Sequence, residues 1–255
     1  MSAFLKCELP GLFVTGTDTG VGKTWVSAQI VGALVRRGTR AGVIKPVASG
    51  IDPACPLPWD SDAAILLDAA GCATPYPASF VDRVNPIRLT APLAPPVAAR
   101  LEGFSLTYPY VCERLQRSLD EWTPGSDLML VEGVGGLLCP LAERRTVADL
   151  AADLDFPLII VARRGLGTLN HTLLTLEAAR MRGLRVAGVI LNGAVPTADP
   201  LAEQTNAEEL ARWLDREPIL AEVPCNPSLE TVSRVFDAVN WGSLSERSRM
   251  THAGT

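Results

Sequence analysis

The chain has 255 residues, of which 47% are hydrophobic and 20% charged, so it carries too much apolar material for a disordered protein and enough for a sizeable core. The formal net charge of -5 argues against nucleic acid as a partner, and no apolar run approaches the roughly 18 residues of a membrane span. The six cysteines form no CxxC pair, as is typical of a reduced, cytoplasmic protein. We expect one domain over residues 1–255.

Short apolar runs alternate with helical patterns along the chain. These patterns predict strands over residues 12–15, 41–44, 128–131, 157–162, 186–191 and 219–220, and helices over residues 23–37, 168–182 and 202–214. Continuous apolar strands with helices between them are typical of a mostly parallel sheet covered on both faces. The predicted fold class is therefore α/β.

Two regions lack this alternation. Residues 52–96 are rich in proline, and we expect loops there around a short helix near residues 62–70. Within them, residues 52–59 have the character of a local extension to which we assign no function. The tail after about residue 241 is of mixed polarity and is expected to fray.

The strongest motif is a glycine-rich loop at residues 16–24, with the sequence GTDTGVGKT. It follows a strand and opens a helix, which is the context of a phosphate-binding loop. Lys23 would reach the β- and γ-phosphates of a nucleotide, and the Thr24 hydroxyl would bind Mg²⁺. Five residues separate Gly16 from Gly22, where the common motif has four, so a glycine-rich turn without a ligand is the alternative.

Lysine is rare in this chain. Only Lys6, Lys23 and Lys45 occur, whereas the other 20 basic residues are arginine, so a lysine within a motif is a candidate for a role that needs a compact charge. Pro46 follows Lys45 and should hold it near the carboxyl edge of the sheet. Two ammonium groups there would suit phosphoryl transfer, in which negative charge must be stabilised. A solvated surface lysine is the alternative for Lys45.

Two carboxylates could complete a metal site. Glu132 follows a buried strand, at the edge where ligands gather in parallel sheets, although it could also be a solvated strand end. Asp62 lies at an expected helix start, where plain capping would explain it equally well. Asn192, after the last long strand, could bind a nucleobase or simply start a turn.

The helix expected from residue 168 begins after a glycine-rich turn. Its free N–H groups could bind an anion such as a carboxylate, but Thr168 as an ordinary N-cap is an equal alternative. His171 has the character of a packed or hydrogen-bonded helix residue and not of a general base.

Taken together, these segments resemble the dethiobiotin synthase family, the ATP-dependent carboxylases of biotin biosynthesis. The resemblance extends over about residues 11–226. It rests on the loop at residues 14–24, KPVASG at 45–50, SDA at 61–63, NP at 85–86, VEG with a following GG at 131–136, and LGTLNH at 166–171. The five-residue loop spacing is similar to that of this family. The resemblance as a whole implies a P-loop NTPase-like domain.

The resemblance implies a reaction at the penultimate step of biotin biosynthesis. CO2, supplied as bicarbonate, forms a carbamate with an amine of 7,8-diaminononanoate. The carbamate takes the γ-phosphoryl group of ATP to give a carbamic–phosphoric anhydride, and the second amine closes the ring. The products are dethiobiotin, ADP and phosphate. The family also implies a homodimer whose substrate site is shared across subunits.

The resemblance further implies roles for individual residues. Lys23 and Lys45 are the catalytic residues, and Mg²⁺ is held by Thr24, Asp62 and Glu132. The implied ATP-binding residues are Thr19, Gly20, Val21, Gly22, Lys23, Thr24, Trp25, Asp62, Glu132, Gly133, Val134, Gly135, Asn192, Gly193, Pro224, Cys225 and Asn226. The implied substrate-binding residues are Lys45, Ser49, Gly167, Thr168, Leu169 and Asn170.

The chain departs from the family at three places, one of which is residues 94–96, APP, where the family often has Ser-Pro-His. Gly20 stands where some members have Glu, and Gly165 replaces a basic residue. One alternative is a P-loop amide ligase of the cobyrinic acid diamide synthase type, but such enzymes usually carry a glutaminase cysteine and histidine, and Cys225 has no histidine near it in the sequence. Another is a partition-type ATPase, which generally has an additional lysine early in the loop, where this chain has residues 17–19, TDT.

Overall fold

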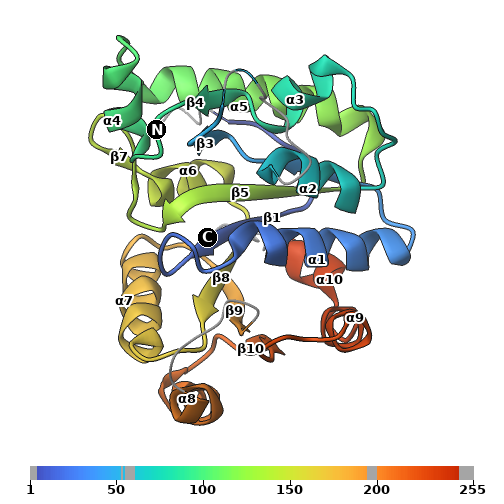
Figure 1. Ribbon diagram of the computed structural model, residues 1–255, viewed down its shortest axis with the longest axis vertical. Coiled ribbons are helices and arrows are strands. Elements are labelled where there is room, and N and C mark those ends of the chain that lie inside the picture. The colour runs from blue at the N-terminus through green and yellow to red at the C-terminus, as the bar shows by residue number, and fades with distance from the viewer. Residues whose placement is uncertain (1–4, 53, 55–60, 194–199, 247–255) are drawn as a thin grey trace, which may run out of the picture.

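A sheet of six parallel strands organises the molecule (Figure 1). The computed structural model describes residues 5–52, 54, 61–193 and 200–246. The strand order is β10-β9-β8-β1-β5-β2, and each neighbouring pair is parallel. The strands are β1 (Gly11–Gly16), β2 (Ala41–Ile44), β5 (Leu128–Gly136), β8 (Leu158–Arg163), β9 (Val186–Asn192) and β10 (Ile219–Val223). The predicted parallel α/β fold is therefore confirmed.

Helices flank this sheet on both sides. In Figure 1, α7 (Thr168–Met181) lies on one side of β8, β9 and β10, while α9 (Leu229–Asp237) and α10 (Trp241–Ser245) lie on the other. The principal helices are α1 (Lys23–Arg36), α5 (Tyr108–Trp122), α6 (Val147–Leu154), α7 (Thr168–Met181), α8 (Pro200–Trp213) and α9 (Leu229–Asp237). No helix in the described part of the chain combines the length and the apolar character needed to cross a bilayer.

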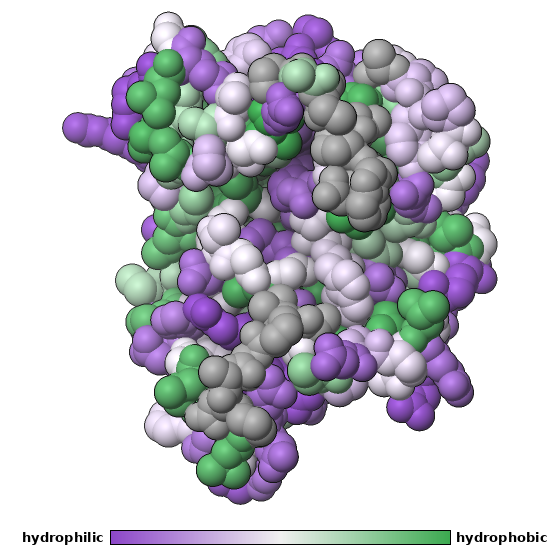
Figure 2. Space-filling view, viewed as in Figure 1, coloured by the Kyte–Doolittle hydropathy of each residue, from purple (hydrophilic) through white to green (hydrophobic). Residues whose placement is uncertain are grey.

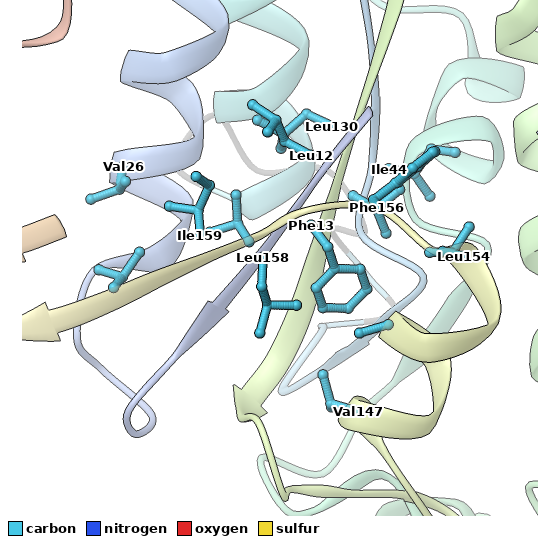
Figure 3. Packing of buried hydrophobic residues seen from close by; sticks show 14 of the residues in the cluster. Leu12, Phe13, Val26, Ile44, Leu130, Val147, Leu154, Phe156, Leu158 and Ile159 are labelled. Carbon is cyan, nitrogen blue, oxygen red and sulfur yellow. The ribbon is translucent and has the colours of Figure 1, made fainter. Parts of the chain in front are cut away.

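The core explains why β1 is apolar at every position except Thr15, which is buried as well. All six residues of β1 are buried, and successive side chains of a strand point to opposite faces. Figure 3 shows Phe13 pointing toward Val147 of α6, while Ile159 of β8 lies toward Val26 of α1. A strand covered on both faces favours apolar residues on both, so β1 lacks the alternation of a half-exposed strand.

The proline-rich region contains more regular structure than we expected. The short helix is confirmed as α2 (Asp62–Ala69), but the expectation of loops elsewhere is wrong in part, since a short strand, β4 (Ile87–Leu89), forms there and pairs in parallel with β3 (Val47–Ser49), which precedes the region. Two further helices, α3 (Ala78–Val84) and α4 (Pro95–Leu101), also form there. The prolines are compatible with these elements because they precede them or occupy a first turn, where a backbone N–H is not needed. The extension at 52–59 lies mostly outside the described residues.

The chain near Trp241 does not fray. Trp241 begins a short helix, α10 (Trp241–Ser245), and is fully buried. Its indole N–H donates to the carbonyl of Phe236 at 2.8 Å, and its ring stacks on that of Phe236 with centroids 6.1 Å apart. The prediction of a frayed tail is therefore wrong up to residue 245, and residues 247–255 lie outside the described part.

Sequence patterns also missed α5, α6 and α9. In α5, the buried residues Val111, Leu115, Leu119 and Trp122 recur at the spacing of one helix face, so the periodic signal was present. A two-stranded antiparallel ribbon of β6 (Pro140–Ala142) and β7 (Arg145–Thr146) precedes α6. These elements cover the sheet but do not change its topology.

Candidate active site

The glycine-rich loop lies between β1 and α1, as the sequence predicts. Gly20 and Gly22 have positive φ angles of 74° and 86°, a conformation that disfavours residues with a Cβ atom. Gly22 is the N-cap of α1 and offers no side chain, so no side-chain group caps the first N–H groups of the helix. Such a helix start attracts anions.

Lys23 folds back over this loop. Its side chain is buried, and Nζ donates to the backbone carbonyl of Asp18 at 3.0 Å. Burial lowers the pKa of Lys23, although the nearby Glu132 opposes this shift. The ammonium group is thus held by a neutral carbonyl at the mouth of the loop, where it can approach a phosphate.

Four side chains from separate elements meet beside the loop. The Thr24 hydroxyl of α1 donates to Oε1 of Glu132 on β5 at 2.8 Å. Lys45, directly after β2, donates from Nζ to the same oxygen at 2.9 Å and also to Asp62 at the start of α2. Nζ of Lys45 lies 3.4 Å from the Thr24 hydroxyl. The structure therefore brings these four residues together, as the sequence predicts.

Their burial decides between the alternatives that the sequence left open. Glu132 is 0% exposed and Lys45 is 6% exposed, so neither is a solvated surface charge. β5 continues to Gly136, which places Glu132 within the strand instead of after it. Asp62 does not cap α2, because Ser61 is the N-cap and accepts the hydrogen bond from the Ala64 N–H. Asp62 instead pairs with Lys45.

The charges of this cluster stabilise one another. Burial by itself would lower the pKa of Lys45, but Glu132 and Asp62 more than offset it, and the net direction is upward. Burial would likewise raise the pKa of Asp62, yet the ammonium groups of Lys45 and Lys23 hold it below its usual range. Lys45 and Asp62 are thus both charged near neutral pH.

The oxygen atoms of this cluster fit a magnesium ion. Oε2 of Glu132 is buried and has no hydrogen-bond partner among the described residues, an arrangement that leaves a carboxylate oxygen available to a cation. Thr24, Asp62 and Glu132 offer hard oxygen donors, which Mg²⁺ prefers. Within the described residues, no group of three or more His, Cys, Asp or Glu forms a protein-only metal cage. Mg²⁺ commonly relies on phosphate and water for its other ligands.

A cavity of about 360 Å³ opens at this edge of the sheet. Its lining contains eleven of the predicted site residues and only Ala48 besides: Thr19, Gly20, Gly22, Lys23, Thr24, Trp25, Lys45, Ala48, Ser49, Asp62, Val134 and Gly135. A larger cavity of about 600 Å³ lies between α8 and the amino end of β10 and contains none of them. We therefore place the candidate active site in the smaller cavity.

Other predicted residues lie farther along the same edge. Asn192, at the end of β9, is fully buried, and its Nδ2 donates to the carbonyl of Val21 in the loop at 2.9 Å. The N–H of Gly193 donates to the carbonyl of Val223 at 2.8 Å, which brings it beside Pro224. The turn through Cys225 and Asn226 follows directly. Gly133 is packed so closely that a Cβ there would lie 2.7 Å from Val147 of α6, so the position leaves no room for a side chain.

The start of α7 is a separate feature. Gly167 is its N-cap with a φ of 86° and no side-chain cap, while Thr168 is fully buried inside the first turn. Thr168 is therefore not an ordinary N-cap, and the first N–H groups have no side-chain partner at the cap. The helix start does not line the 360 Å³ cavity, so one chain alone does not bring Leu169 and Asn170 to that site.

One contact near the loop had no signal in the sequence. Arg163, at the end of β8, donates from Nη2 to Asp18 at 3.1 Å and lies 3.3 Å from Nδ1 of His171. His171 is thus hydrogen-bonded, as expected for a helix residue that is not a general base. The contact ties the phosphate-binding loop to α7.

Comparisons with known proteins found relatives that match most of the chain. The family described as "AAA domain" matches residues 10–233. The ATP-dependent dethiobiotin synthetase BioD of Anaeromyxobacter sp. (strain K) is 45% identical over 90% of this chain and 96% of its own length. The protein of the same name from Bacillus subtilis (strain 168) is 39% identical over 92% of this chain and 96% of its own length.

A solved structure of low identity shares the fold. The MinC:MinD cell division protein complex of Aquifex aeolicus matches with a TM-score of 0.50 at 15% identity, covering 88% of this chain and 85% of the other. At that identity the similarity concerns the arrangement of strands and helices alone.

Proposed function

This chain belongs to the family of ATP-dependent dethiobiotin synthetases, and from that premise we propose that it joins CO2 to 7,8-diaminononanoate and closes the ureido ring of dethiobiotin. It is an ATP-dependent ligase of biotin biosynthesis. In the proposed sequence, one amine adds to CO2 and loses a proton to give a carbamate. A carbamate oxygen then attacks the γ-phosphorus of ATP and releases ADP. The second amine attacks the carbonyl carbon, loses a proton and expels phosphate.

The observation that carries this proposal is the meeting of Lys23, Thr24, Lys45, Asp62 and Glu132 at one rim of the sheet. The carbamate is already a nucleophile, so the protein needs to position two anions and to neutralise their charge. Lys23 reaches across the phosphate-binding loop, and Lys45 faces the same cavity from the next strand. Their two ammonium groups would stabilise charge on the transferring phosphoryl group.

Thr24, Asp62 and Glu132 would hold the metal, as their oxygen donors allow. A bound Mg²⁺ supplies charge neutralisation at the phosphate oxygens. Without the metal, Lys45 pairs with both carboxylates, so the buried Glu132 has an ammonium partner. The phosphates would rest on the N–H groups of Thr19, Gly20, Val21 and Gly22.

Ser49 is the proposed contact to the diamine or the carbamate. It ends β3 and lines the cavity together with Lys45 and Trp25. A hydroxyl can accept a hydrogen bond from an amine or donate one to a carbamate oxygen. The adenine would lie along the rim toward Asn192, Gly193 and the turn at residues 224–226, where β9 and β10 end side by side.

A second copy of the chain would complete the substrate site. The helix start at Gly167, Thr168, Leu169 and Asn170 suits the substrate carboxylate, although the N–H of Thr168 itself donates to the carbonyl of Gly165 at 3.2 Å. These residues lie outside the cavity of their own chain. Leu138 and Leu174 are 48% and 60% exposed and line an adjoining cavity of about 370 Å³, and Leu166 is exposed as well. Such an apolar surface beside the helix start supports a homodimer with shared sites.

The surface and the cysteines support a cytoplasmic enzyme. Figure 2 shows hydrophilic and hydrophobic residues interspersed on one face, with hydrophobic atoms gathered at the upper left over α4. The cysteines that the structure describes are all free thiols. This is the state that a reducing compartment maintains. We propose one domain with no nucleic-acid or membrane partner.

The proposal is tested by product analysis. The protein is incubated with Mg²⁺, ATP, ¹³C-bicarbonate and 7,8-diaminononanoate, and the products are identified by mass spectrometry. We expect a cyclic urea that carries one ¹³C atom, with one ADP and one phosphate per ring. Absence of this product, together with ADP release that the diamine does not stimulate, would contradict the proposal.

The shared site is tested by a matched pair of variants. Leu174→Asp should yield monomers in sedimentation and lose the stimulation of ADP release by the diamine. Leu229→Asp, which alters an 87% exposed residue at the start of α9, should remain dimeric and active. A monomeric wild-type protein with full activity would overturn the shared site without affecting the assignment of the reaction.

A further inference from the structure

The backbone of Lys45 is held on both sides by one short segment. Its N–H donates to the carbonyl of Val84 at 2.7 Å, and its carbonyl accepts a hydrogen bond from Nδ2 of Asn85 at 2.6 Å. We infer that Asn85 is a positioning residue for Lys45, which fixes the origin of its side chain so that Nζ remains at the phosphoryl-transfer site. This inference rests on the proposed function of Lys45.

The topology explains why Lys45 needs such a partner. β2 is an edge strand, and Ile44 is its last residue paired with β5. Lys45 therefore stands beyond the ladder, and Pro46 after it has no N–H to donate. A buried backbone carbonyl without a partner is unfavourable. The Asn85 amide supplies the hydrogen bond that a neighbouring strand would otherwise provide.

Asn85 is itself fixed. It is 3% exposed and is the C-cap of α3, and its N–H donates to the carbonyl of Val81 at 2.7 Å. Its carbonyl accepts a hydrogen bond from Nη1 of Arg88 at 2.8 Å. With these backbone contacts in place, the side-chain amide has little freedom to leave Lys45.

The same segment continues along the substrate side of the cavity. β4 pairs with β3 so that Val47 lies opposite Ile87 and Ser49 opposite Leu89. Residues 84–89 therefore run beside residues 45–49 from the catalytic lysine to the proposed substrate contact. Asn85 is the side chain in this segment that reaches the backbone of Lys45.

Loss of the Asn85 amide should act through the position of the Lys45 ammonium. Nζ of Lys45 contacts groups on three other elements, namely Thr24, Asp62 and Glu132, so a small rotation at its Cα would displace it from all of them. The rate of phosphoryl transfer is sensitive to displacements of this kind. The hydrogen bonds of Asn85 itself go to Lys45, Val81 and Arg88 and not to the phosphate-binding loop. The expected effect is on kcat and not on nucleotide affinity.

The test is a double-mutant cycle. Asn85→Ala, and Asn85→Asp, which removes the donor at nearly constant volume, should each lower kcat about tenfold and leave the Kd for an ATP analogue within about twofold. In a Lys45→Ala background the same changes should alter the residual rate by less than about twofold. An equal fold-loss in both backgrounds would mean that Asn85 is merely structural, and an unchanged kcat in the single variants would overturn its role altogether.

A second measurement does not depend on turnover. The chain has only three lysines, so acetylation of Lys6, Lys23 and Lys45 can be followed peptide by peptide with mass spectrometry. Asn85→Ala should raise the labelling rate of Lys45 about threefold or more relative to the exposed Lys6, and leave Lys23 unchanged. An unchanged Lys45 rate would overturn the inference even in a protein whose reaction proved to be different.

A destabilised variant remote from the site serves as the control. Leu210→Ala alters a fully buried residue of α8, at the opposite edge of the sheet, and should lower the melting temperature. It should change neither kcat nor the labelling of Lys45. If it slowed turnover as much as Asn85→Ala, general destabilisation would explain both results.

Discussion

The hydroxyl of Thr24 donates a hydrogen bond to Oε1 of Glu132 at 2.8 Å, joining residues that are 108 positions apart in the sequence. The same oxygen accepts from Lys45 at 2.9 Å, and the other carboxylate oxygen, Oε2, is buried without a partner in the part of the chain that the structure describes. Glu132 thus connects the phosphate-binding helix, the second lysine and the proposed metal position. Several consequences of this arrangement can be measured.

The first concerns Glu132→Gln. The amide oxygen can still accept from Thr24, but the negative charge that Mg²⁺ and Lys45 face is lost, so kcat/KM should fall at least about 100-fold. The apparent affinity for Mg²⁺, measured by titrating ADP release, should weaken. Glu208→Gln, on the exposed face of α8, is the control and should behave as the wild type. A wild-type Mg²⁺ dependence in Glu132→Gln would exclude Glu132 as a metal ligand.

The second concerns Lys45→Arg. The guanidinium group keeps the charge but is too large for a site in which Nζ contacts Asp62, Glu132 and the Thr24 hydroxyl. Turnover should fall about 100-fold, while calorimetry should show ATP binding close to the wild type. Lys6→Arg, at an exposed position, should change neither. Normal turnover in Lys45→Arg would remove the proposed catalytic role.

The third concerns the buried end of the described chain. Trp241→Ala would open a cavity beneath Phe236 and should lower the free energy of unfolding by about 3–5 kcal/mol. Denaturant unfolding measures this loss. Trp213→Ala removes the same side chain from a 61% exposed position and should cost far less. Equal losses in the two variants would contradict the burial of Trp241.

The fourth concerns pH and the start of β5. Hydrogen bonds from the Arg40 side chain and backbone lower the pKa of Asp127 to about 2. Because the folded-state pKa is depressed, the stabilising effect is present above the ordinary value of 3.8 and is lost as the pH falls through about 2. NMR titration of the Asp127 carboxyl should show this midpoint.

Arg40→Ala provides the comparison for that titration. It removes the side-chain hydrogen bonds at 2.6 and 3.1 Å but keeps the backbone hydrogen bond at 2.9 Å, so the midpoint should move only part of the way back. A midpoint in the wild type that already lies near 3.8 would show that the pair does not form in solution.

The sequence alone determined the features of this protein that depend on residues close together in the chain. Strands buried on both faces are continuous apolar runs, so the sheet could be predicted, and the glycine-rich loop at residues 16–24, placed between a strand and a helix, indicated a phosphate site. The rarity of lysine singled out Lys23 and Lys45 before any geometry was known. The proline-rich region misled prediction because proline count does not distinguish a loop from short elements that begin beside a proline, as α3 and α4 do.

Tertiary structure decided whatever depends on which distant residues meet. Sequence left Asp62 between capping a helix and binding a metal, and the structure excludes the cap, because Ser61 occupies that position and Asp62 pairs with Lys45. The sequence could not show that Asn85 holds the carbonyl of Lys45, because a carbonyl beyond the end of an edge strand lacks a partner only once the sheet is assembled. Propensity and periodicity act over a few residues, whereas burial and pairing arise from the whole fold, and for that reason the site's partners were decided by the structure.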